Sequence, residues 1–310
     1  MEQSHYKIFW RIGQEITPET FIQADNYICS QQNLIRRLIA NQYYGLLPQP
    51  DAGNTSLLME ARISSNDILI DELKCLGITN AGYLIDFDNS LLGETYKDHL
   101  TIPDYGSGNY YVVLRVKPFE PSLIEPVENE EAPLARPEYE INVKELGRIS
   151  DDELPVMKIK AGSYPEIDDD YIPPCMSITS SDKLMDGFRN IKDIITEINT
   201  QINLKKDQYK ASIYHLHILT LELKIFPLTE PPVSLFRLIK KFVKTYIFFI
   251  PEIRVLTEPD FLSEYNHNDI SIILKLLLQY LHEIHQIVSK IEIKEEIKVV
   301  VVEEDLTPKI

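Results

Sequence analysis

The spacing of apolar positions changes once along the chain, near Ser180. Before that point, short apolar runs at 57–63, 68–85 and 110–116 are separated by Gly, Asn and Asp. Their β-branched and aromatic composition predicts strands. Because no helical stretches alternate with these runs, the pattern favours a β-sandwich or barrel over βαβ units. One early helix is expected over 18–40, where apolar residues at helical spacing follow Thr17-Pro18.

Beyond Ser180 the apolar period becomes close to 3.5 residues. Four amphipathic helices are predicted: from Ser181, over 207–225, after Pro231-Pro232, and after Asn268-Asp269. Short connections between such helices favour an antiparallel four-helix bundle. The apolar band of the last helix is wide enough to predict burial on two sides, as in a bundle that also packs against copies of itself. Its stripe includes Leu277, Leu281, Ile284 and Val288.

Proline-rich and acidic segments divide the rest of the chain. Segment 118–140 has five prolines and an acidic excess, which predicts an extended loop. Asp168–Asp170 is expected to be a solvated acidic loop before Tyr171-Ile172-Pro173-Pro174, a predicted hinge between domains. The end, with its apolar run 297–302, is predicted to form a strand.

The predicted class is therefore α+β. A β-sandwich shell domain covers 1–176, a four-helix bundle covers 177–292, and a C-terminal strand or tail covers 293–310.

Net charge and cysteine content narrow the function classes. The chain has 31 Lys and Arg against 48 Asp and Glu, a net charge of −17, which argues against a nucleic-acid partner. Residues 1–180 hold 14 basic and 29 acidic residues, a difference of −15, whereas 181–310 hold 17 and 19, a difference of −2. Three widely spaced cysteines and the absence of a signal peptide or a long apolar run predict a cytoplasmic protein.

No catalytic, cofactor-binding or metal-binding motif is present. The sequence contains neither GxGxxG, nor a P-loop, nor a GxSxG elbow. A di-iron bundle needs paired Glu-x-x-His motifs, and within the helical half beyond Ser180 only Glu264-x-x-His267 has that spacing, so the histidines are interpreted as polar-face residues. We therefore expect no enzyme activity and no small-molecule substrate. Arg237, Lys240, Lys241 and Lys244 form a basic helix face that suits a solvated surface, a membrane surface or an acidic partner.

Three ordered segments match the signature of one known family in residue type and order. The N-terminal signature is matched by Trp10, Gly13, Pro18, Phe21, Asp25 and Tyr27, although Ile12 and Thr20 replace the family's Glu and His. Tyr171-Ile172-Pro173-Pro174-Cys175 is similar to the passage from the β domain into the bundle. Tyr265, His267 and Asp269 are similar to the motif that opens the last helix, where we expect them to form its cap. Together, these segments resemble TssK, the trimeric baseplate subunit of bacterial type VI secretion.

The resemblance implies a structural adaptor. It implies a homotrimer with Leu277, Leu281, Ile284 and Val288 in the seam, and a shell that attaches to the TssF–TssG wedge at the cytoplasmic face of the inner membrane. Trp10 and Phe21 would lie either in that interface or in the core. Family members usually carry a further C-terminal head that engages the membrane complex, so the chain resembles a headless, Bacteroidetes-like variant. Two alternatives stay open: a receptor-binding or tail-fibre adaptor of another contractile apparatus, and a metal-binding four-helix-bundle enzyme.

Overall fold

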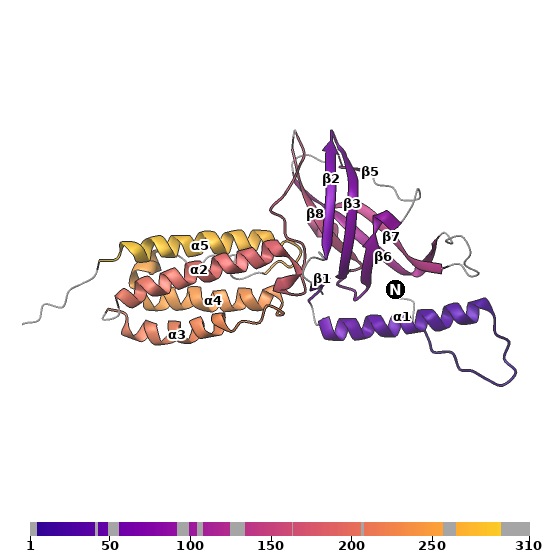
Figure 1. Cartoon of the computed structure of the whole chain (residues 1–310), viewed down its shortest axis with the longest axis horizontal. Helices are drawn as coiled ribbons and strands as arrows, with labels where there is room; N and C mark the ends of the chain where they lie inside the picture. The colour runs from indigo at the N-terminus through magenta and orange to yellow at the C-terminus, as the bar shows by residue number, and fades with distance from the viewer. Residues whose placement is uncertain are drawn as a thin grey trace, which may run out of the picture.

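The computed structural model describes residues 5–40, 43–48, 56–91, 99–103, 108–124, 134–162, 164–205, 208–256 and 265–292. Within these ranges, antiparallel sheets are followed along the chain by four consecutive α-helices, which confirms the α+β class. The strands lie at one end of the elongated molecule, and helices α2 to α5 lie at the other (Figure 1). The domain boundaries expected at 176 and 292 stay predictions.

The strands form two sheets. In the first, the long central strand β3 (Asp67–Ile78) pairs with β1 (Gly45–Leu46), β2 (Leu57–Ser64), β4 (Leu84–Asp88) and β5 (His99–Thr101). The second has the order β7-β6-β8-β9, with β6 (Gly108–Ile124), β7 (Leu134–Glu145), β8 (Glu153–Ala161) and β9 (Glu166–Ile167). Alternate residues of both sheets belong to one buried cluster, among them Ile68, Ile70, Leu73, Val112, Leu114 and Leu154.

The prediction of an extended loop over 118–140 was wrong for its described residues. β6 continues to Ile124 and β7 begins at Leu134, and Pro121 lies opposite Pro137 in the ladder. Proline is tolerated here because the register shifts between Lys117 and Pro121, and because β7 is an edge strand. Residues 125–133 lie outside the described residues.

The helices agree closely with the apolar pattern. They are α1 (Pro18–Ala40), α2 (Asp182–Leu204), α3 (Lys210–Lys224), α4 (Pro232–Phe249) and α5 (Ile270–Lys290). Pro232 occupies the first turn of α4, where its missing N–H costs nothing. Short 3₁₀ segments lie at η1 (Asn89–Leu91), η3 (Leu146–Arg148), η4 (Ile178–Ser180) and η5 (Pro251–Val255).

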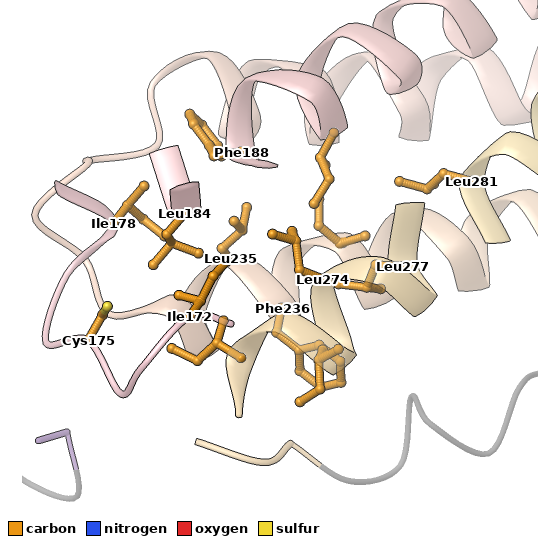
Figure 2. Close-up of a cluster of buried hydrophobic side chains, with 14 of the residues drawn as sticks. Ile172, Cys175, Ile178, Leu184, Phe188, Leu235, Phe236, Leu274, Leu277 and Leu281 are labelled. Carbon is orange, nitrogen blue, oxygen red and sulfur yellow. The ribbon is translucent and has the colours of Figure 1, made fainter. Parts of the chain in front are cut away.

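Helices α2 to α5 run side by side and share one apolar interior (Figure 1). Residues of the 172–178 segment, α2, α4 and α5 gather at the end nearest the strands (Figure 2). Leu277, Leu281, Ile284 and Val288 are all buried in this interior by their own chain. A seam between copies at these four positions would need surface that is already covered, so their burial accounts for intramolecular packing instead.

None of the described helices is long and apolar enough to cross a membrane. The strand expected at the C-terminus, within 293–310, lies outside the described residues.

Candidate functional site: the N-terminal helix and the buried joint

Helix α1 turns its polar side toward the rest of the chain. At 100° per residue, Asn26, Ser30, Asn33 and Arg37 fall on one side of the helix. Asn33 is buried, and a Cβ placed on Gly82 would lie 2.8 Å from the Asn33 carbonyl oxygen and 2.4 Å from Arg37 Cγ. Gly82, at φ +86°, is therefore the close contact between this helix and the β3–β4 turn.

The opposite side of α1 is apolar and exposed. Phe21, Ile28 and Ile35 repeat every seven residues on that side, and each is more than half exposed. Leu34 and Leu38 extend the stripe toward the end of the helix. An ordinary surface helix buries its apolar stripe and exposes its polar one, so the orientation of α1 is inverted.

Within the described residues, a polar cavity separates part of α1 from the strands. The cavity has a volume of about 820 Å³ and is lined by Ser30, Asn33, Arg37, Arg115 and Lys117 among others. The segment before the helix adds further exposed apolar side chains: Tyr6, Phe9, Trp10, Ile12 and Ile16. Contiguous apolar surface of this extent marks a site of interaction with another molecule.

The six residues of the N-terminal signature lie on this surface or beside it. Trp10 and Phe21 are both about half exposed, so neither belongs to the core of the isolated chain. Pro18 begins α1, Asp25 is exposed on it, and Tyr27 is half-buried. Gly13 adopts φ +82°, and a Cβ added there would meet no atom within 4 Å, so its backbone conformation, rather than close packing, favours glycine.

A second cluster joins the strands to the helices. Asp269, fully buried, is the N-cap of α5, where its Oδ1 accepts a hydrogen bond from the Ile272 amide. Its Oδ2 accepts from Lys158 Nζ of β8 at 2.7 Å and from the Tyr111 hydroxyl of β6 at 2.9 Å. One carboxylate therefore fixes the start of α5 to two adjacent strands.

The other two residues of the motif before α5, Tyr265 and His267, form a chain of hydrogen bonds to Tyr44, the residue before strand β1. The Tyr265 hydroxyl lies 2.9 Å from His267 Nδ1, and His267 Nε2 lies 2.7 Å from the Tyr44 carbonyl oxygen. Because that carbonyl accepts a hydrogen from Nε2, Nδ1 of the neutral ring is left to accept from Tyr265. Burial lowers the pKa of His267 below its usual value, although the bond to the Tyr44 carbonyl opposes the shift. We call the buried contacts that Asp269, Tyr265 and His267 make with the strand domain the joint. Within it, Asp269 is also the N-cap of α5.

The predicted hinge is tightly packed. Tyr171, Ile172, Pro173 and Pro174 are all buried, and the Tyr171 hydroxyl donates to the Asn268 carbonyl at 3.0 Å. The Pro174 carbonyl accepts from the Leu46 amide at 2.8 Å. A Cβ on Gly45, which has φ +117°, would lie 2.2 Å from Pro174 backbone atoms. Segment 171–174 is therefore fixed at its start by Asn268, before α5, and at its end by Leu46 of β1.

Sequence reasoning missed Lys158 and Tyr111, and it misplaced Asp168. Rather than lying in a solvated loop, Asp168 is buried, 3.5 Å from Lys158 Nζ and 3.0 Å from Lys160 Nζ. Burial alone would raise the pKa of Asp168, but the hydrogen bond from Lys160 and the neighbouring lysine charges outweigh it and lower the pKa. The sequence signal for the lysine partners is the pair Lys158 and Lys160 within a strand whose middle, from Leu154 to Met157, is apolar.

Over the residues that the structure describes, no group of three or more His, Cys, Asp or Glu is arranged to hold a metal ion. Cys175 is fully buried, and burial raises the pKa of its thiol. A buried thiol of this kind is a poor nucleophile.

No family model and no curated protein matches the sequence. Solved structures do match the fold. A crystal structure of TssK matches with a TM-score of 0.63 and 13% identity, over 94% of this chain and 71% of that one. The fold is similar to that of TssK. A chain in a cryo-electron microscopy structure of the type VI secretion TssK–TssF–TssG baseplate subcomplex matches with a TM-score of 0.60 and 14% identity, over 92% of this chain and 99% of that one. A chain in the type VI secretion baseplate complex matches with a TM-score of 0.59 and 14% identity, over 91% of this chain and 100% of that one.

Proposed function

We propose that this chain is a non-enzymatic structural subunit of a type VI secretion baseplate, built like TssK. The observation that carries the proposal is the fold similarity, which extends over the strands and the helices together and reaches chains in two baseplate assemblies. With 13–14% identity, the likeness concerns the fold. The partners below are therefore proposals that rest on this chain's own surfaces.

The inverted helix α1 and segment 5–16 supply the assembly surface in this proposal. Burying a stripe such as Phe21, Ile28 and Ile35 contributes about 1.5–3 kcal/mol per fully covered side chain. In the isolated chain each of them is just over half exposed, so about half of that free energy is available to a partner. We propose that the chain forms homotrimers and that this surface contacts proteins equivalent to TssF and TssG. The shell and bundle of the TssK architecture correspond to the strands and to α2–α5.

A pull-down of the tagged chain from its native host, followed by mass spectrometry, tests the proposal. We expect wedge-type baseplate proteins among the captured partners, and a native mass equal to three copies for the purified chain. The variant Ile28→Asp with Ile35→Asp should lose the wedge proteins but keep its helical circular dichroism, because both side chains are already exposed.

The matched control is Ile225→Asp, at an exposed position after α3. This variant should capture the same partners as the unaltered chain. Capture of phage-tail receptor-binding proteins in place of wedge proteins would contradict the proposal.

A further inference from the structure

Helix α4 is strongly basic in a strongly acidic protein. Its 18 residues contain four cations and no carboxylate, while the whole chain carries −17. Arg237, Lys241, Lys244 and Phe248 are spaced 4, 3 and 4 residues apart, so they share one side of the helix, and all four are exposed. Lys241 forms an ion pair with Glu222 of α3 at 3.2 Å, and Lys240 and Lys244 also have interaction partners. The stripe is a concentrated positive surface that nothing in the proposed function uses.

The stripe leads to an apolar depression at the end of the helices farthest from the strands. Lys244, Ile247, Phe248 and Arg254 line a shallow hollow of about 430 Å³. Phe248 is 67% exposed and Val255, at the end of η5, is 83% exposed. The Arg254 guanidinium donates to the Phe248 carbonyl at 2.9 Å, which holds a cation at the rim. A segment that fits here needs apolar side chains followed closely by carboxylates.

Residues 293–310 of this chain have that order. An apolar run, Ile297 and Val299–Val302, is followed directly by Glu303, Glu304 and Asp305. The segment leaves α5 at the same end of the helices as the hollow. The carbonyls of Val288 and Glu292 accept hydrogen bonds from the side chains of Lys205 and Gln208, and the neighbouring Tyr209 hydroxyl donates to Glu252 of η5 at 2.9 Å.

The segment after α5 is long enough to reach the hollow on α4. Glu303 follows Glu292 by eleven residue steps, which corresponds to a reach of up to about 36 Å in an extended chain. That exceeds the length of α4, about 27 Å for its 18 residues. The carboxylates can therefore reach the end of α4 that lies beside η5, where Lys244 and Arg254 are.

We propose that residues 297–305 dock on α4 of the same chain, with the valines over Ile247, Phe248 and Val255 and the carboxylates against Lys244 and Arg254. Docking covers an exposed aromatic side chain and places three negative charges beside a surface of opposite sign. Within one chain the docking is intramolecular, so even weak contacts are effective at the high local concentration. An acidic segment of another protein and an anionic membrane are the competing occupants.

Paramagnetic relaxation in the full chain tests the proposal. A nitroxide is placed at Thr307→Cys in a Cys29→Ser background, since Cys75 and Cys175 are buried. Methyl signals of Ile247 and Val255 should lose more than half of their intensity, whereas the methyl signal of Ile70 in β3, among the strands at the other end of the molecule, should be unchanged. Unchanged signals at Ile247 and Val255 would overturn the proposal.

Reciprocal charge changes separate specific docking from chance proximity. Replacing Glu303, Glu304 and Asp305 by Lys should restore the two methyl signals, and so should Lys244→Glu with Arg254→Glu. Combining both sets should bring the broadening back, which simple unfolding of either region cannot do. Failure of the combined variant to recover the broadening would contradict the charge pairing.

A mixed sample tests the identity of the occupant. Spin-labelled chain without methyl labels is mixed with methyl-labelled chain without the nitroxide, and no broadening is expected. Broadening in this sample would mean docking between copies and would overturn the intramolecular proposal. Unbroadened signals in the singly labelled chain, together with binding to phosphatidylserine vesicles that Lys244→Glu abolishes, would assign the surface to a membrane instead.

Discussion

Replacing Lys158 by Met should lower the free energy of unfolding, because it removes the buried ion pair that joins β8 to the start of α5. Lys158 Nζ lies 2.7 Å from Asp269 Oδ2, and the two side chains are 6% and 0% exposed. At an effective dielectric constant of about 20, two unit charges at this distance attract by about 6 kcal/mol, and desolvation offsets part of that. Met fills a similar volume, so the main effect is to leave the Asp269 carboxylate buried without a cation. The expected cost is about 3–5 kcal/mol of folding free energy.

Urea denaturation followed by circular dichroism measures the effect. With a slope of about 1–3 kcal/mol per molar urea, the midpoint should fall by at least about 1 M. The double variant Lys158→Met with Asp269→Asn should recover at least half of the loss, because a neutral amide can still accept from Tyr111. The matched control is Lys275→Met, which breaks an exposed ion pair with Asp170 and should leave the midpoint unchanged. Equal midpoints for the two lysine variants would refute the assigned role of the buried pair.

Three further changes probe the joint and the helix packing. Burial lowers the pKa of His267, so below about pH 6.5 the unfolded chain binds a proton that the folded chain does not. The free energy of unfolding should therefore fall from pH 7 to pH 5, and thermal melts at each pH should show this fall. The variant His267→Asn should reduce the slope. Gly45→Ala should cost more than about 2 kcal/mol in urea denaturation, from the left-handed backbone and the contact with Pro174; an unchanged midpoint would show that this contact relaxes freely. Leu281→Ala should cost about 2–5 kcal/mol, whereas the exposed Leu204→Ala should cost little, and similar losses would contradict the assigned core.

The helix boundaries could be predicted because local chemistry sets them. Pro232 begins α4 and Asp269 caps α5, and both are visible in the sequence next to an apolar stripe. The strands around Pro121 and Pro137 were missed because proline is read as a loop signal, while an edge strand with a register shift accommodates it. Local sequence does not reveal which strand will lie at an edge.

The contacts of the joint could not be predicted, because they are made at long range. Lys158 and Asp269 are 111 residues apart, and Tyr111 and Asp269 are 158 apart. The stripe of α1 was visible as a pattern, but a pattern shows where apolar residues lie and not what they face. The same limit applies to Leu277 and Leu281, whose spacing fits a seam within a chain and between chains equally well.

Reconstitution with TssF and TssG proteins from the same host tests the central claim most directly. The purified chain is mixed with a TssF–TssG preparation, and the mass of the product is measured by native mass spectrometry. A baseplate subunit should form a stable complex that contains the chain in multiples of three, and Ile28→Asp with Ile35→Asp should prevent this while Ile225→Asp does not. A chain that stays unbound at micromolar concentrations, with its helices intact, would contradict the baseplate role.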